Sequence, residues 1–244
     1  MLRGGRTKYD FDLIENGCNL GIAAGLNIGI REVKAKECLW AALFDQDSRV
    51  EPGFIEFALK AFNDGSNPPQ VGIVCPVYLD SQTGMVLPFL RSPKDGILAA
   101  MTSGSLIPVN LFEKVGTFNE ALFIDYVDIE FCLRCRRAGY HIIQSQRAIL
   151  HHSQGHIIQH RLLGCCFAST NHSAARRYYI TRNRLWVLGR FLGDWAWSRK
   201  EARALVTETI KLLLVEGDRL KKLKSIVLGM LDAAGGRLGY RCEL

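Results

Sequence analysis

The chain has 244 residues, of which 48% are hydrophobic, so it can bury the core of one domain and carry a helical extension. Its first ten residues, "MLRGGRTKYD", lack the apolar core of a signal peptide, and no apolar run approaches the roughly 20 residues that cross a bilayer. We therefore expect a soluble cytoplasmic protein. The net charge of +7 favours acidic partners, such as nucleotide phosphates, an anionic membrane surface or nucleic acid. Nucleic acid is the least favoured, because no aromatic platform is interleaved with the basic residues.

The eight cysteines fit a reducing compartment. We expect reduced and mostly buried thiols, because the following lie in apolar or helical patterns, or side by side without a second pair: Cys38, Cys75, Cys132, Cys135, Cys165 and Cys166. Cys132 and Cys135 have the spacing of half a zinc site. No second half with ligand spacing accompanies them, so zinc binding there is not favoured.

Strands and helices alternate along the first two thirds of the chain. The pattern predicts a short strand at 11–16, a helix at 21–36, a buried strand at 38–44, a helix at 52–62, a loop at 65–70, a strand at 71–78 and a turn at 80–84. After 98–108 it predicts a short helix that Gly116 ends, a helix at 127–138 that Gly139 ends, and a strand in "YHIIQS". Such alternation is typical of an α/β fold with a largely parallel sheet covered by helices.

The last third is predicted to be helical, at 174–190 and 205–231. We expect a core at 1–160 and a helical extension at 161–244. In the extension, apolar residues recur at helical spacing opposite basic ones: Leu220, Leu223, Ile226, Val227, Met230 and Leu231 against Arg219, Lys221, Lys222 and Lys224. This basic amphipathic helix fits a peripheral contact with an anionic membrane, and equally a helix packed on the domain with its polar side in water.

Asp45 and Asp47 follow the predicted buried strand 38–44. Ligands of open α/β sheets bind at the carboxyl ends of strands, and acids at i and i+2 of an extended chain point to the same side. Such a pair suits a hard divalent cation that also binds phosphate oxygens. The alternative is a solvated turn, where aspartate is common. We favour the functional interpretation, because six apolar residues precede the pair.

The stretch "NLGIAAGLNIG" forms a second candidate site. Gly21, Gly25 and Gly29 recur every four residues, which leaves one helix face bare for a backbone or a ligand. For the glycines alone, close packing of the helix on the sheet is the better interpretation. Asn19 and Asn27 would bring amide groups to the same region.

Asp125 and Asp128 stand at the start of the helix predicted at 127–138. Either acid could cap the helix, where a carboxylate contributes about 1 kcal/mol. Capping does not require two acids three residues apart. An aspartate that faces a pocket from a helix start can also accept a proton from a substrate hydroxyl, so both are catalytic candidates.

Six stretches occur in the order seen in bacterial rhamnosyltransferases of the family-two inverting glycosyltransferases: "NLGIAAGLNIGI", "LFDQDS", "TSGSLIP", "FNEALFIDYVDIEFCLR", "HHSQG" and "YYITRNRLWVLGR". The chain resembles this family from about Leu13 to "GGRLG" near its C-terminus. The resemblance implies a GT-A fold, a nucleotide-sugar donor (dTDP-L-rhamnose) and a saccharide or lipid-linked acceptor in cell-surface polysaccharide synthesis.

The resemblance also implies roles for individual residues. Asp45 and Asp47 would hold Mg²⁺ or Mn²⁺ against the donor diphosphate, and Asp128 would be the general base. The remaining implied residues are Asn19, Gly21 and Asn27 in the nucleotide-sugar pocket, His152 of the His152-to-Gly155 motif near metal and phosphates, and Arg182 with Asn183 near the phosphates. Without the resemblance, "RRYYITRNR" would be interpreted as a solvated basic helix. His151 and His156 fall outside the family motif and are expected to be structural or exposed.

Members of that family have about fifty further residues upstream, which supply strands that grip the nucleotide base. We therefore expect an incomplete N-terminal part of the sheet and weakened donor binding. Two alternatives follow. One is a degenerate transferase that acts as a binding or assembly partner. The other is a haloacid-dehalogenase-like phosphatase, because "LFDQDS" resembles its first motif. The phosphatase is less favoured, because "EGDRLKK" is a poor substitute for its later motifs.

Overall fold

The computed structural model describes residues 11–92, 96–153, 158–162, 165–193 and 195–242. A sheet of five strands forms its centre, in the order β1 (Trp40–Ala42), β6 (Leu106–Pro108), β3 (Val71–Asp80), β7 (His141–His152) and β2 (Arg49–Val50). Two hairpins accompany it: β4 (Leu90–Ser92) with β5 (Gly96–Ala99), and β8 (Ile158–Leu162) with β9 (Cys165–Ser169). The predicted α/β fold class is confirmed.

The prediction of a largely parallel sheet is wrong for the described strands. Only β3 and β7 pair in parallel, whereas β1 with β6, β3 with β6, and β2 with β7 are antiparallel. Two short strands cause this difference: β6 enters the sheet between β1 and β3 and runs against both, and the edge strand β2 runs against β7. Strands of two and three residues carry too little sequence pattern to reveal their direction.

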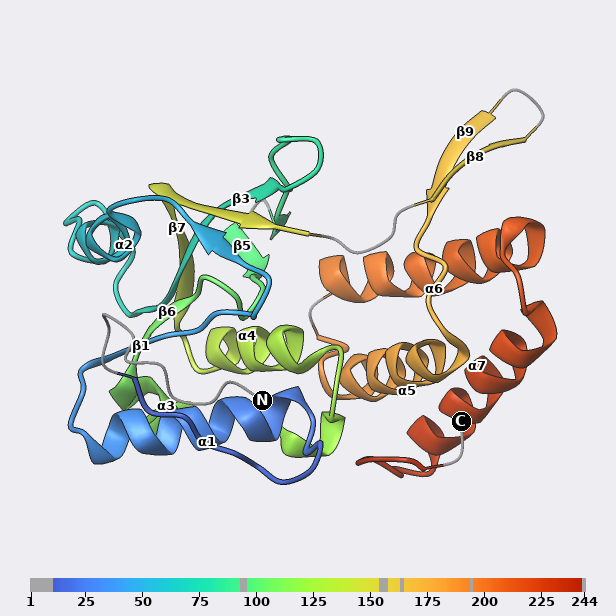
Figure 1. Cartoon of the computed structure of the whole chain (residues 1–244), viewed down its shortest axis with the longest axis horizontal. Helices are drawn as coiled ribbons and strands as arrows, with labels where there is room; N and C mark the ends of the chain where they lie inside the picture. The colour runs from blue at the N-terminus through green and yellow to red at the C-terminus, as the bar shows by residue number, and fades with distance from the viewer. Residues whose placement is uncertain (1–10, 93–95, 154–157, 163–164, 194, 243–244) are drawn as a thin grey trace.

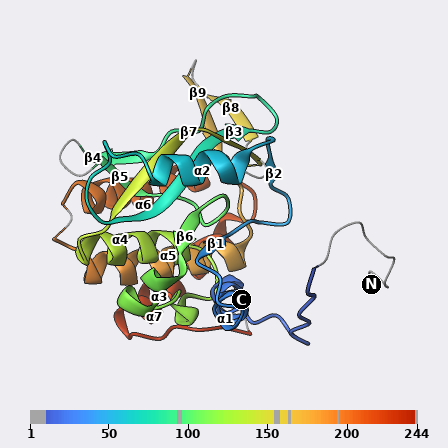
Figure 2. The same cartoon turned by 90° about the vertical axis from the view of Figure 1, so that its left-hand side faces the viewer.

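Helices cover the sheet and build a second layer beside it (Figure 1). The core carries α1 (Ile22–Ala35), α2 (Phe54–Phe62), α3 (Val109–Val115), the 3₁₀ turn η1 (Glu120–Leu122) and α4 (Val127–Arg137). The extension carries α5 (Ala174–Arg190), α6 (Trp195–Val215) and α7 (Arg219–Ala234). Figure 2 shows α2 lying across the sheet, where it packs on β3 and β7.

Most predicted helices are confirmed, and three other predictions need correction. Residues 11–16 form no strand, and the buried strand expected at 38–44 shortens to β1, with Leu39 and Phe44 exposed. The helix expected at 205–231 is two helices, α6 and α7, because the chain turns at 216–218 and Asp218 takes a left-handed conformation. Beginning α6 at Trp195 adds ten residues of helix that the periodicity did not indicate.

The thiols divide into two groups among the described cysteines. Cys75, Cys132 and Cys135 are buried, as expected, but Cys38 is exposed. The side chains of Cys165 and Cys166 lie outside the described part of the structure. Burial raises the pKa of the Cys135 thiol to about 12, so this thiol stays protonated and serves packing.

Candidate active site

Asp45 and Asp47 leave β1 in a turn that Ser103 holds. The Ser103 hydroxyl oxygen accepts a hydrogen bond from the Asp45 backbone N–H at 3.1 Å, and it lies 2.6 Å from the hydroxyl oxygen of Ser48. Ser103 is fully buried, so it anchors the turn to the interior of the protein. The two acids therefore lie in a fixed turn shortly after the end of β1.

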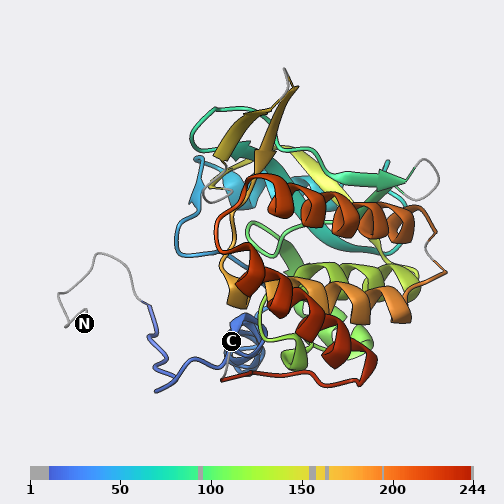
Figure 3. The same ribbon diagram turned by 90° about the vertical axis from the view of Figure 1, so that its right-hand side faces the viewer.

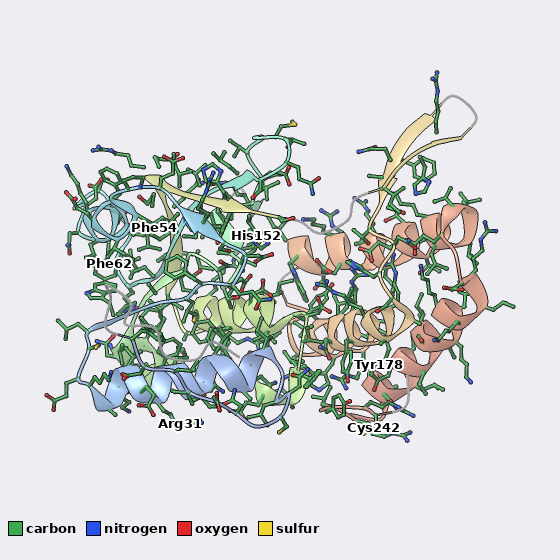
Figure 4. The ribbon with its side chains drawn as sticks, in the orientation of Figure 1. Arg31, Phe54, Phe62, His152, Tyr178 and Cys242 are labelled. Atoms are coloured by element: carbon green, nitrogen blue, oxygen red, sulfur yellow. The ribbon has the colours of Figure 1, made fainter. Side chains whose placement is uncertain are left out.

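His152 meets the two carboxylates from the end of β7. One ligand atom from each of Asp45, Asp47 and His152 lies within 4.8 Å of the others, which is the spacing of a candidate metal site. The Nδ1 atom of His152 is buried and has no hydrogen-bond partner among the described residues. A buried ring nitrogen without a partner fits a ligand role, and two carboxylate oxygens with one imidazole nitrogen suit a divalent cation. Figure 4 labels His152 near the middle of the molecule.

The electrostatics of the cluster also favour a cation. Burial raises the pKa of Asp45, the charge of His152 opposes this effect, and the neighbouring Asp47 carboxylate adds to it. Two carboxylates this close repel each other when both are ionised. A divalent cation between them would remove that repulsion.

The loop that carries Asp125 and Asp128 has an unusual backbone. Phe123, Asp125 and Tyr126 have φ angles of 65°, 61° and 65°, in the left-handed region that residues with a Cβ rarely adopt. Tyr126 ends this segment, and α4 begins at the next residue. The backbone of Ile129 donates a hydrogen bond of 2.8 Å to Asp128 Oδ1. Asp128 therefore lies in the first turn of α4, where the helix dipole favours a negative charge.

Helix α5 holds this strained loop in place. The side-chain amide of Asn183 donates hydrogen bonds to three carbonyl oxygens of the loop, those of Leu122, Ile124 and Asp125, at 2.9, 2.7 and 3.0 Å. Arg182 donates to the Leu122 carbonyl as well, at 3.1 Å. Both side chains are buried. We call Asn183 and Arg182 the loop clamp.

Asp128 and Asp125 differ in their environments. Burial raises the pKa of Asp128 to about 6. The hydrogen bond from Ile129 lowers this pKa, and the charges of Asp125 and Asp45 raise it by smaller amounts. Asp125 forms an ion pair with Arg176 on α5, at 3.0 Å. A carboxylate whose pKa lies near neutrality suits a general base.

Two cavities meet at these residues. One, of about 600 Å³, is lined by both Asp125 and Asp128, by Thr102, and by residues of α5 and α6. The other, of about 900 Å³, is lined by Asp45, Asp47 and the residues around them. The two cavities share the following wall residues: Ile22, Asp45, His152, Thr170, His172 and Arg176. This arrangement places a candidate metal site and a candidate base on adjoining spaces, as a reaction between two substrates requires.

A buried network of charges supports the wall of the smaller cavity. The Tyr126 hydroxyl group donates to Glu201 and accepts from Arg184, which also pairs with Glu208 at 2.9 Å. Arg177 continues the network by pairing with Glu208 at 3.3 Å and with Glu216 at 2.7 Å. The network links the loop before α4 to α5 and α6, so the helical extension is part of the site.

Comparison with known proteins identifies the family. No family model matches the chain. The dTDP-rhamnosyl transferase RfbF of Shigella flexneri is 31% identical over 245 residues, which cover 93% of this chain and 79% of the relative. The chain belongs to this rhamnosyl transferase family. The crystal structure of GalNAc-T7 with UDP, GalNAc and Mn²⁺ superposes with a TM-score of 0.48 at 15% identity, over 88% of this chain; the match spans 43% of GalNAc-T7.

In this member of the rhamnosyl transferase family, several residues that were predicted to line the donor pocket line neither cavity. Asn27 is buried and bonds with the Phe118 backbone and with Glu120, so it fastens α1 to the segment before η1. Asn19 is exposed, and its side chain accepts from the Gly21 backbone N–H. A Cβ on Gly21 would lie 2.5 Å from the Phe123 carbonyl oxygen, so this glycine permits close packing on the strained loop.

Arg182 lines neither cavity, in contrast to its expected place near the phosphates. Its guanidinium donates to the carbonyl oxygens of Leu122 and Gly239 and to Asn183 Oδ1. Gly25 and Gly29 have open space where a Cβ would stand, so close packing of α1 on the sheet does not explain them. Gly25 instead lines the larger cavity. Gly155 and His156 lie outside the described residues.

Two ionisable wall residues of the candidate site, His172 and Arg176, were not predicted. His172 and Arg176 line both cavities, and burial lowers the pKa of His172, with the charges of Arg176 and Arg177 acting in the same direction. They lie about fifty residues beyond Asp125, on the approach to α5 and in its first turn. Only the cluster of cations at the start of "RRYYITRNR" hinted at them.

Proposed function

We propose that the chain transfers L-rhamnose from dTDP-L-rhamnose to a saccharide acceptor, free or lipid-linked, with inversion at the anomeric carbon. The observation that carries the proposal is the meeting of Asp45, Asp47 and His152 with Asp128 at two adjoining cavities. The membership of the rhamnosyl transferase family supports the donor, because the relative is named for dTDP-rhamnosyl transfer. The phosphatase and the degenerate binding protein are not favoured.

The larger cavity is proposed to bind the donor. Asp45, Asp47 and His152 would hold Mn²⁺ or Mg²⁺ there, and the ion would neutralise charge that develops on the leaving nucleotide diphosphate. Arg176, which lines the same cavity, would add a positive charge beside the diphosphate. Donor binding is therefore expected to require a metal.

The smaller cavity is proposed to bind the acceptor, with Asp128 as the base. Its carboxylate accepts the proton of an acceptor hydroxyl as that oxygen attacks the anomeric carbon on the face opposite the leaving group. The bond from the anomeric carbon to the diphosphate oxygen breaks in the same displacement, which inverts the centre. Asp125 remains paired with Arg176 and keeps Asp128 in a negative field, which raises its basicity.

Calorimetric titration with dTDP and with dTDP-L-rhamnose, with and without Mn²⁺, tests the donor site. We expect binding that requires Mn²⁺ and that Asp47→Ala abolishes. Glu56→Ala, which removes an exposed carboxylate from α2, is the control and should bind as the unchanged protein does. Equal affinity without metal, or full binding by Asp47→Ala, would contradict the proposal. Release of dTDP on adding candidate acceptors, lost in Asp128→Asn, then tests turnover.

A further inference from the structure

Helix α6 exposes a stripe of aliphatic side chains. The exposed fractions of Val206, Ile210, Leu213 and Leu214 are 58%, 50%, 43% and 51%. Their spacing of i, i+4, i+7 and i+8 places all four on one face of the helix. Single exposed aliphatic residues need no explanation, but a contiguous row marks an interaction surface.

Helix α7, which follows the turn at 216–218, exposes a second row of aliphatic side chains. Leu220, Val227 and Leu231 are 84%, 54% and 59% exposed, and their spacing of i, i+7 and i+11 again selects one face. Figure 3 shows α6 and α7, in orange and red, together at the front of the helical extension. The opposite side of α7 packs on α5, where Gly229 allows close approach: a Cβ there would lie 2.8 Å from the Tyr178 carbonyl oxygen. We call the two exposed rows the α6–α7 surface.

The charges of these helices are sorted by side. Exposed cations lie within or beside the two rows: Arg199, Lys200, Arg203, Lys221 and Lys224. Four acids face inward and are taken up in ion pairs or hydrogen bonds: Glu201, Glu208 and Glu216 with buried Arg184 or Arg177, and Asp232 with the buried Tyr178 hydroxyl and with Arg241. Asp218, at the turn, is the exposed exception among the described acids of this segment. The α6–α7 surface therefore combines aliphatic groups with positive charge.

The positive charge of the α6–α7 surface indicates which kind of partner it fits. A second copy of the chain would bring the same cations against each other without acids to pair them, so self-association by this surface is opposed. Nucleic acid would find no aromatic side chain among the exposed large residues of the two rows. Aliphatic side chains flanked by Lys and Arg match the boundary between acyl chains and anionic headgroups.

We propose that the α6–α7 surface docks the protein on an anionic lipid bilayer, with both helices lying in the plane of the interface. None of the described helices is long and apolar enough to cross a membrane, which agrees with a surface position. The cations differ from those expected from sequence. Lys222 is buried and pairs with Glu216 at 2.9 Å, so it contributes nothing to lipid binding, whereas α6 supplies half of the surface.

Vesicle flotation of the full chain without donor or acceptor tests the inference and is independent of the proposed reaction. We expect binding to vesicles of phosphatidylglycerol and phosphatidylethanolamine, weak binding to phosphatidylcholine alone, and release by salt. Ile210→Glu should lower the partition coefficient about tenfold or more, because one aliphatic side chain is kept out of the bilayer. Lys224→Ala should lower it about fivefold, which corresponds to about 1 kcal/mol.

Matched controls lie on α2, away from this surface. Ile55 is 42% exposed and Lys60 is exposed, so Ile55→Glu and Lys60→Ala make the same chemical changes and should leave vesicle binding unchanged. Three results would overturn the inference. They are no binding of the folded chain to anionic vesicles at low salt, equal binding to neutral vesicles, or a dimer in light scattering that Ile210→Glu dissociates. Circular dichroism checks that each variant is folded. The salt dependence of vesicle binding is measured on the unchanged protein, so it tests the inference even if a variant fails to fold.

Discussion

The acid–base behaviour of Asp128 follows from its burial and from two neighbouring carboxylates. Burial, Asp125 and Asp45 all disfavour its ionised form, and the pKa rises to about 6. A base accepts a proton only when it is deprotonated, so kcat/KM should fall about tenfold per pH unit below about pH 6. Asp125→Asn removes one negative charge and should move this midpoint to lower pH. A pH–rate profile at saturating Mn²⁺ measures both; Asp64→Asn, an exposed acid, is the control.

The same shift has a stability consequence. The unfolded pKa is near 3.8 and the folded one near 6, so ionised Asp128 opposes folding. The cost is absent below about pH 4, where both states are protonated, grows as pH rises to about 6, and is then constant at roughly 2 to 3 kcal/mol. Asp128→Asn should therefore unfold at higher denaturant concentration at pH 8 but not at pH 4, while losing turnover. Equal stabilisation at both pH values would contradict this account.

The acids of the candidate site could be predicted from the sequence around them. The other wall residues could not, because they are far from these acids in sequence. Asp45 and Asp47 follow an apolar run, and Asp128 begins a periodic helix, so each carries its own signal. His172 and Arg176 reach the site only because α5 packs on the loop before α4. Asn27 showed the reverse: an amide near glycines suggests a ligand, but its partner is a backbone carbonyl 91 positions away.

The loop clamp connects α5 to the loop that precedes Asp128, the proposed base. Asn183→Ala would leave the carbonyl oxygens of Leu122, Ile124 and Asp125 without this donor and relax a segment with three left-handed residues. We expect a loss of about 1 to 3 kcal/mol of stability. Because Asp128 follows this loop directly, whereas Asp45, Asp47 and His152 lie on other elements, kcat should fall more than the affinity for dTDP. Asn63→Ala, at an exposed position, is the control; unchanged kcat in Asn183→Ala would contradict the role.

Helix α7 approaches α5 through Gly229. A Cβ at this position would lie 2.8 Å from the Tyr178 carbonyl oxygen, which cannot move without shifting α5. Gly229→Ala should cost about 1 to 3 kcal/mol by overpacking. Gly29→Ala is the matched control, because Gly29 is also helical but has nothing within 4 Å, so it should stabilise by about 0.5 to 1 kcal/mol. Urea unfolding of both variants measures these changes. If Gly229→Ala left the free energy of unfolding unchanged, α5 and α7 would be able to move apart to accommodate the added methyl group.

At the level of elements, periodicity predicted long helices well and short strands poorly. The helix expected at 174–190 agrees with α5, because seventeen residues repeat one pattern over several turns. Sheet direction failed because β6 has only three residues. The break between α6 and α7 was missed because apolar residues continue at helical spacing on both sides of it.

Arg184 joins the core to the extension across the whole molecule. It is buried and contacts Tyr126, Glu201 and Glu208. Arg184→Met keeps most of the volume but leaves Glu201 without a cation, so the free energy of unfolding should drop by about 3 to 5 kcal/mol. Arg203→Met, at an exposed position on α6, should have little effect. If core and extension unfold together, both variants should unfold in a single cooperative transition. Two transitions would show that core and extension unfold separately.

The wall shared by the two cavities makes them thermodynamically dependent on each other. His172 and Arg176 face both spaces, so a ligand that fixes their side chains in one space alters what the other can bind. By linkage, an acceptor that tightens donor binding by some factor must itself be tightened by the donor by that same factor. Affinities measured for either substrate alone would then understate the affinity that matters during turnover, and an inhibitor that spans both spaces would gain from the coupling.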